Sequence, residues 1–169
     1  MRYYFFLYLC AQNLVNNLDL YIISLKGLSS GDYAYDWKLD DKFFALFETS
    51  EISDAEIDVQ LVVVKHSRYF DLSFDLDGWA QVSCDRCLDP VKLEISLQSQ
   101  MIVRFGECAG EDQSDENDVV ILPYGEEQLD VAQYLYEFAH LSLPIRRVHQ
   151  TKESCNADMI TKLEKFLIN

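Results

Sequence analysis

The chain has 169 residues, 49% hydrophobic and 25% charged, so it is long enough to bury a full core and too apolar to be wholly disordered. Twenty-nine acidic residues against fourteen lysines and arginines give a formal net charge of −15, which excludes general coating of nucleic acid and favours basic partners. Its 5 cysteines do not suggest the disulfide framework of a small secreted domain, so a reducing compartment is expected.

Residues 1–12, MRYYFFLYLCAQ, are interpreted as a hydrophobic N-terminal extension, and residues 13–169 are expected to form a single domain. The apolar run from Tyr3 to Ala11 has the length of a signal-peptide core, but it is too short to cross a bilayer. Three interpretations stay open: a secretion signal, an additional hydrophobic strand or docking segment, and an extended or misassigned start. A signal is disfavoured because a single arginine precedes the run and no small-x-small cleavage site follows it.

Alternation of apolar and polar residues predicts most of the strands, because successive side chains of a strand point to opposite faces of a sheet. His66-Ser67 is expected to connect two of them as a hairpin, and Asp77-Gly78 carries the signature of a tight turn. Residues 107–118 carry six acids and no base, which predicts a solvated loop. Strands are expected at residues 18–25, 56–65, 69–77, 79–84, 91–105 and 119–123.

Capping residues and 3.6-residue spacing predict the helices. A short helix over 41–47 begins behind Asp40, a second follows a capping box of Asp130 and Gln133, and a third is capped by Asn156. The predicted fold class is α+β: an antiparallel sheet of about six strands with a C-x-x-C β-knuckle, and two to three helices packed on one face or edge.

The segment QVSCDRCLDPVKLEIS, residues 81–96, places Cys84 and Cys87 in a turn between two predicted strands. A thioredoxin-type pair needs a helix N-terminus to stabilise its thiolate, whereas Cys87 is followed by Leu88-Asp89-Pro90 and a strand. A tight turn between strands suits a zinc knuckle, because it directs both sulfurs to one centre.

A metal site needs two further ligands, and the segment VHQTKESC supplies His149 and Cys155 between two predicted helices. With Cys84 and Cys87 they would form a closed Cys₃His site that has no open position for Lewis-acid chemistry. Three interpretations of these thiols stay open: a bound zinc ion, reduced structural thiols, and a redox pair. The other two cysteines, at positions 10 and 108, are predicted to be unliganded. No phosphate loop, zincin or kinase signature occurs, so no catalytic residue is predicted.

The order of these features resembles the YceD family, the large ribosomal RNA subunit accumulation proteins. The resemblance is carried by CDRCLDPV with its C-x-R-C-L-x-P core, by the segment LDVAQYLYEFAHLSLPI, and by the His149 and Cys155 that follow. It spans residues 18–168, so the domain over 13–169 is predicted to be YceD-like. The sequence departs from the pattern in its hydrophobic start and in a second cysteine cluster that is reduced to Cys155.

This resemblance implies a bacterial, cytoplasmic, non-enzymatic factor needed for normal levels of large-subunit ribosomal RNA. Because the acidic body repels RNA, we expect a binding adaptor whose few cations gather beside the knuckle and touch phosphate locally. Its expected partners are the large-subunit ribosomal RNA precursor, basic ribosomal proteins, or both, with no membrane involved. The candidate binding residues are Arg86, Arg146, Arg147 and Lys152.

Alternatives to this hypothesis stay open at the level of residues and of function. The alternative for the four basic residues is that they only neutralise nearby acids and do not contact RNA. The alternatives for the function are a thiol oxidoreductase that uses Cys84 and Cys87, and a structural interaction protein unrelated to ribosomes.

Overall fold

The structure is a computed structural model that describes residues 18–107 and 119–167. The predicted extension over 1–12, the cysteines at positions 10 and 108 and nearly all of the predicted acidic loop lie outside the described residues, so these predictions stay predictions. The same holds for the expectation of a single domain over 13–169. Within the described ranges, no helix combines the length and apolar character needed to cross a membrane.

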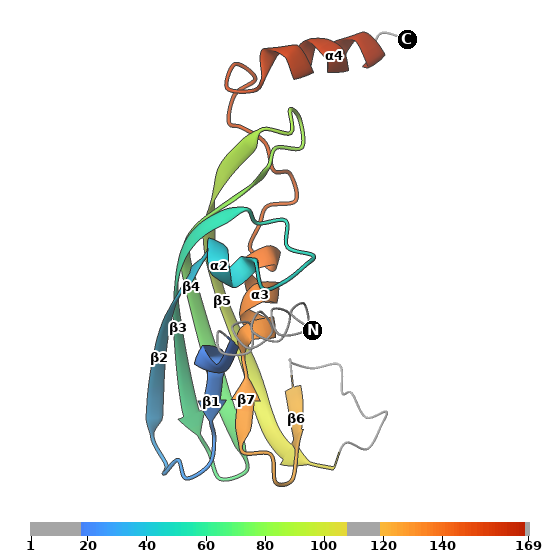
Figure 1. The fold of residues 1–169 in the computed structure, drawn as a ribbon. Coiled ribbons are helices and arrows are strands. Elements are labelled where there is room, and N and C mark those ends of the chain that lie inside the picture. The colour runs from blue at the N-terminus through green and yellow to red at the C-terminus, as the bar shows by residue number, and fades with distance from the viewer. Residues whose placement is uncertain (1–17, 108–118, 168–169) are drawn as a thin grey trace, which may run out of the picture. The chain divides into compact units, whose positions relative to one another are not determined.

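Two sheets and three α-helices make up the part of the chain that the structure describes (Figure 1). The strand order is β2-β3-β4-β5-β6 in the larger sheet and β1-β7 in the smaller one, and β6 is parallel to β5. In chain order the elements are η1 (Asp19–Tyr21), β1 (Ile22–Ser24), β2 (Asp32–Asp40), α2 (Asp41–Phe44), β3 (Asp54–Lys65), β4 (Tyr69–Ser83), β5 (Pro90–Gly106), β6 (Val119–Pro123), β7 (Gln128–Asp130), α3 (Ala132–Leu141) and α4 (Ala157–Leu167). The predicted α+β class with mostly antiparallel strands is confirmed, and the strands are divided between two sheets.

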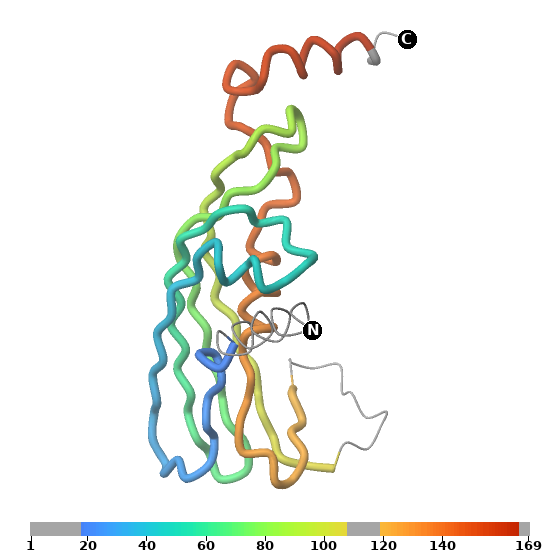
Figure 2. The backbone as a smooth tube through the Cα atoms, viewed as in Figure 1, coloured from blue at the N-terminus to red at the C-terminus, as the bar shows by residue number. Residues whose placement is uncertain are grey.

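The chain folds as two compact units, and both contain residues of β2, β3, β4, β5 and α3. Unit 1 falls within Met1–Asp36, Gln60–Asp75 and Gln98–Phe138, and unit 2 within Trp37–Val59, Leu76–Leu97 and Ala139–Asn169. The backbone tube traces β4 into β5 through the short turn that carries the C-x-x-C pair, which belongs to unit 2 (Figure 2).

Aromatic contacts hold the core of unit 1. Phe74 of β4 meets Phe138 of α3 edge to face with ring centroids 5.1 Å apart, and Phe70 meets Phe105 at 6.0 Å. The Asp130 carboxylate accepts from the Ala132 backbone N–H at 2.9 Å, which caps the start of α3 as predicted. The second half of the predicted capping box is replaced, because the Gln133 side chain donates to Glu137 at 2.7 Å.

Unit 2 contains the other two predicted helix starts, and both are confirmed. The Asp40 carboxylate accepts from the backbone N–H groups of Lys42 and Phe43, each at 3.1 Å, and begins α2. The Asn156 side chain caps α4 by accepting from the Asp158 and Met159 N–H groups at 3.1 and 3.3 Å. These caps satisfy backbone donors that the first turn of a helix leaves without partners.

The predicted turn at Asp77-Gly78 is wrong, because β4 runs without a break from Tyr69 to Ser83. Gly78 has φ 154°, and a Cβ atom there would lie 2.1 Å from the backbone oxygen of Glu56 in β3. Glycine is therefore needed for the close approach of two backbones and not for a reversal of the chain. The predicted connection at His66-Ser67 is confirmed, with the His66 N–H donating to the Tyr69 oxygen at 2.9 Å.

We expect Gly78→Ala to lower the free energy of unfolding by at least about 2 kcal/mol, because the new methyl group forces β3 and β4 apart. Urea denaturation monitored by tryptophan fluorescence measures this loss. Gly27→Ala is the matched control: Gly27 has φ 73° and no heavy atom would lie within 4 Å of an added Cβ atom, so this substitution carries only a conformational cost of about 1 kcal/mol. Equal losses in the two variants would contradict the close-approach explanation.

Candidate metal centre

The C-x-x-C pair lies in residues 84–89, between the end of β4 and the start of β5, as the sequence predicts. Two backbone hydrogen bonds close this knuckle: the Cys84 N–H donates to the Asp89 oxygen, and the Leu88 N–H donates to the Cys84 oxygen, both at 2.9 Å. Leu88 adopts a left-handed conformation with φ 66°, which lets the chain reverse over so few residues. The knuckle therefore folds by local backbone bonding and places both sulfurs on one side.

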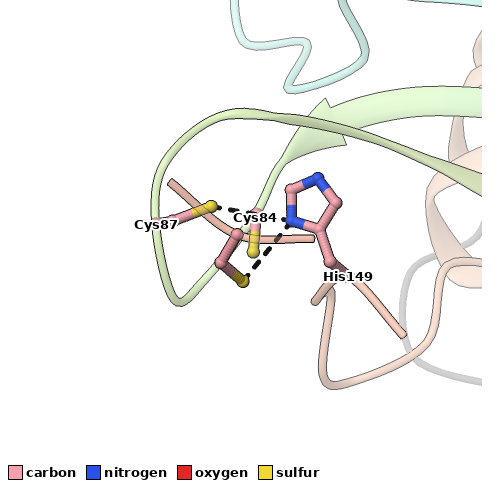
Figure 3. Close-up of side chains that lie close together, drawn as sticks. Cys84, Cys87 and His149 are labelled. Atoms are coloured by element: carbon pink, nitrogen blue, oxygen red, sulfur yellow. Dashed lines mark hydrogen bonds between the residues drawn. The ribbon is translucent and has the colours of Figure 1, made fainter. Parts of the chain in front are cut away.

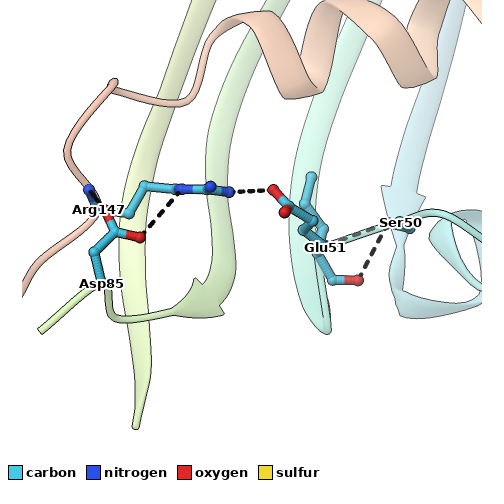
Figure 4. Close-up of polar contacts among 5 residues, drawn as sticks. Ser50, Glu51, Asp85 and Arg147 are labelled. Atoms are coloured by element: carbon cyan, nitrogen blue, oxygen red, sulfur yellow. Dashed lines mark hydrogen bonds and ion pairs between the residues drawn. The ribbon is translucent and has the colours of Figure 1, made fainter. Parts of the chain in front are cut away.

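Backbone pairing brings the segment after α3 to the knuckle. The Asp85 N–H donates to the Arg147 oxygen, and the Arg147 N–H donates to the Asp85 carboxylate, both at 2.7 Å. The Arg147 guanidinium also pairs with Glu51 and lies 3.9 Å from the Asp85 carboxylate, so it bridges two acids (Figure 4). These contacts fix the chain two residues before His149 against the knuckle.

His149 and Cys155 join the two knuckle cysteines in one cluster (Figure 3). The ligand atoms of Cys84, Cys87, His149 and Cys155 all lie within 4.8 Å of one another. The His149 Nδ1 atom is 3.6 Å from the Cys87 sulfur and 3.7 Å from the Cys155 sulfur. A tetrahedral zinc site with bonds of about 2.0–2.3 Å has ligand separations of roughly 3.5–3.8 Å, and both Nδ1–sulfur distances fall in this range.

The orientation of the imidazole also suits a ligand. Its Nε2 atom lies 3.2 Å from the Pro90 backbone oxygen. Because a carbonyl oxygen only accepts, Nε2 carries the proton and Nδ1 presents its lone pair to the sulfurs. The three cysteines are buried, with Cys84 0% exposed, and His149 is half-buried. The cluster is therefore closed to solvent on most sides and could hold a metal ion such as zinc.

The pKa values of two cluster thiols shift in opposite directions. Burial raises the pKa of the Cys84 thiol, but backbone N–H groups of the knuckle and of His149 donate to the sulfur and bring the pKa down to about 6. The Arg86 N–H is one such donor, at 3.4 Å. Burial, and then the adjacent Cys87 thiol, raise the pKa of Cys155. The Arg86 guanidinium donates to the Cys155 sulfur at 3.5 Å, which is a charge-assisted contact once that sulfur is ionised.

The four basic residues expected to bind RNA occupy different environments. Arg86 reaches a cluster sulfur and Arg147 is paired with two carboxylates. Lys152 lies 3.6 Å from Glu164, with both side chains largely exposed. Arg146 is exposed and has no partner among the residues that the structure describes. Three of the four cations are therefore already engaged, and Arg146 is the one that is available.

The sequence did not single out the partners that position this cluster. Glu51 is 96 residues from Arg147, so no local pattern connects them. The Pro90 oxygen is a backbone atom, and its contact with the imidazole leaves no signal in the side chains. The one local signal for these partners is Asp85, between Cys84 and Arg86. A carboxylate in such a knuckle is well placed to accept a hydrogen bond from the backbone N–H of a neighbouring segment.

The fold and the cluster define an α+β protein whose C-x-x-C knuckle is met by a histidine and a cysteine from the C-terminal segment. The family model described as large ribosomal RNA subunit accumulation protein YceD matches residues 72–165, which is more than half of the chain and includes all four cluster residues. The chain therefore belongs to the YceD family, and membership implies a role in large-subunit ribosomal RNA accumulation. No curated protein and no solved structure matches it.

We expect Leu88→Gly to be more stable than Leu88→Ala by about 1 kcal/mol, because glycine adopts the φ of 66° without the Cβ clash of other residues. Leu88 is 65% exposed, so truncation to alanine removes little packing and isolates the backbone effect. Chemical denaturation of both variants beside the parent chain measures the difference. Equal stability of the two variants would mean that Leu88 is not strained.

Proposed function

We propose that this chain supports large-subunit ribosomal RNA accumulation as a non-enzymatic binding adaptor in the cytoplasm. Its partners are the large-subunit ribosomal RNA precursor, basic ribosomal proteins, or both. The family match over residues 72–165 supports this proposal, because the matched segment contains the knuckle and both ligand candidates of the C-terminal segment. A chain of net charge −15 suits a factor that reaches RNA only locally and offers acidic surface to basic proteins.

In this proposal a zinc ion is held by Cys84, Cys87, His149 and Cys155. Four protein ligands leave no open position, so such an ion serves to anchor the C-terminal segment to the knuckle and does not activate water. Three thiolates and one neutral imidazole outweigh the charge of Zn²⁺ and leave a net negative site. The Arg86 guanidinium, 3.5 Å from the Cys155 sulfur, is placed to offset that charge.

The phosphate contact is assigned chiefly to Arg146. Arg86 and Arg147 are held by the cluster and by carboxylates, so releasing either one for RNA would cost the contacts that position the C-terminal segment. The exposed pair of Lys152 and Glu164 is worth little in water, so Lys152 is able to exchange its partner for phosphate. The proposed RNA-contacting surface is therefore Arg146 with support from Lys152.

A thiol oxidoreductase is the second candidate function, favoured by the Cys84 pKa of about 6. Reactive cysteines are usually partly exposed as well as ionised, whereas Cys84 and Cys87 are 0% and 1% exposed. A third candidate, an interaction protein unrelated to ribosomes, has no specific contact in its favour. The burial of both sulfurs supports the adaptor over the oxidoreductase, and the family match supports it over an unrelated interaction protein.

We expect the purified chain to bind one zinc ion, and addition of a chelator to lower its melting temperature. At free zinc about 1,000 times the dissociation constant, the stabilisation is roughly 4 kcal/mol. Replacing zinc by Co²⁺ should give the intense absorption of thiolate-to-cobalt charge transfer. Cys155→Ser should weaken that band, while Cys108→Ser, at a cysteine predicted to be unliganded, should leave it unchanged. An identical melting curve with and without chelator would count against the anchor.

We expect Arg146→Glu to reduce co-sedimentation with pre-ribosomal particles by roughly tenfold, because it replaces a phosphate contact with a repulsion. Its melting temperature should stay within about 1–2 °C of the parent, since the side chain is exposed and has no partner among the described residues. Sucrose-gradient sedimentation of tagged variants from lysate measures the association. Arg104→Glu makes the same charge change at an exposed position of β5 and serves as the control.

Nuclease treatment of the same lysates separates the candidate functions. Ribosomal proteins that are lost on digestion indicate RNA contacts, and those that are retained indicate protein contacts. Arg146→Glu that sediments like the parent would remove Arg146 from the interface. Recovery of the chain with no ribosomal component would favour an interaction protein unrelated to ribosomes.

A further inference from the structure

A second candidate site lies in unit 1 and shares no residue with the cysteine cluster. It is a cavity of about 640 Å³, within the range of roughly 300–1,000 Å³ that is usual for small-molecule sites. Four segments line it: the β3–β4 hairpin, the turn between β6 and β7, the end of β1 and the end of β5 at Phe105, and these elements can be followed in Figure 1. The Leu25 N–H donates to the Glu127 oxygen at 2.9 Å, which holds two of these segments together.

The charges lining this cavity favour an anion. Lys26 pairs with Glu127, so these two charges cancel. Lys65 donates to the Leu28 backbone oxygen and has no carboxylate partner among the described residues, which leaves its charge uncompensated. Arg68 is exposed and has no partner in the part of the chain that the structure describes. Three cations therefore face two carboxylates, an excess of positive charge on a chain whose net charge is −15.

Aromatic rings form the rest of the wall. Tyr124 is 73% exposed, although aromatic side chains contribute most to stability when their rings are buried. Tyr69 stacks on His66 with ring centroids 4.5 Å apart, and Phe70 lies 5.8 Å from the Lys65 ammonium. These contacts fix the positions of the ammonium and of the stacked rings, so the wall is largely formed before a ligand arrives. An exposed ring beside uncompensated cations suits a ligand that is both planar and anionic.

We propose that this cavity binds a nucleotide, with its phosphate near Lys65 and Arg68 and its base stacked on Tyr124. The charge excess selects the phosphate, the exposed ring selects the base, and the volume admits one nucleotide and excludes a duplex. The same chemistry comes from two sources, a free nucleoside monophosphate or an unpaired residue of single-stranded RNA. The proposal does not depend on the knuckle, because no lining residue belongs to it.

The test uses the full chain with three probes: AMP, a fluorescein-labelled single-stranded RNA hexamer, and inorganic phosphate. We expect saturable binding of AMP by calorimetry or of the hexamer by fluorescence anisotropy, and much weaker binding of phosphate. Arg68→Ala should weaken binding about tenfold, as expected for a lost charge-assisted hydrogen bond. Tyr124→Ala should weaken it about fivefold or more, while Tyr124→Phe keeps the ring and the affinity. For the hexamer, Arg68→Ala should reduce the salt slope of log K by about 0.7.

Arg104→Ala, at an exposed arginine of β5 outside the cavity, is the matched control and should bind like the parent. Binding of AMP alone assigns a free nucleotide, and binding of the hexamer alone assigns an unpaired RNA residue; both results support the proposal. Phosphate binding as tight as AMP binding would reduce the cavity to a simple anion site and overturn it. Absence of saturable binding of AMP and hexamer, or binding that neither Arg68→Ala nor Tyr124→Ala changes, would also overturn it.

Discussion

The organisation of unit 2 depends on the convergence of three sulfurs and one imidazole within 4.8 Å. The apolar side chains of the segment that follows α3 are not buried, since Ile145 is 104% exposed and Leu143 and Val148 are half-buried, so packing alone would not hold it. Backbone pairing of Asp85 with Arg147 brings this segment to the knuckle, and the cluster then fixes it at two further points, His149 and Cys155.

This arrangement determines which cations are left for partners. Arg86 is drawn to the Cys155 sulfur and Arg147 to Glu51, so two arginines that appear basic in the sequence act within the fold. The cation count near a site is therefore a poor guide to its potential, because paired charges contribute little field. Of the four cations expected beside the knuckle, Arg146 is left exposed without a partner among the described residues, and at the cavity of unit 1 neither Lys65 nor Arg68 has a carboxylate partner there.

Sequence reasoning predicted the elements whose signals are local. Period-two alternation gave β3 and β5, a short apolar run closed by Pro123 gave β6, and the side chains of Asp40 and Asn156 gave two helix starts. It failed at Gly78, because the Asp-Gly signature of a turn is local while the requirement for glycine comes from the Glu56 backbone of another strand. It also missed β7, which has only three residues and is too short for periodicity to detect. The missed β2 alternates half-buried Tyr and Trp with exposed Asp and Ala, so its signal is also local.

The same distinction between local and distant signals applies to the two candidate sites. The spacing of Cys84 and Cys87 is a local motif, so the knuckle was predicted, and the two further ligand candidates were sought because a structural zinc ion takes four ligands. The cavity in unit 1 has no motif, because its lining comes from four segments and its cations look like ordinary surface residues in the sequence. Only the fold shows that Arg68 lacks a partner among the described residues while Lys26 has one. A site that depends on charged side chains without partners can therefore be identified only from tertiary contacts. A site that depends on the spacing of metal-ligand candidates can be predicted from the sequence.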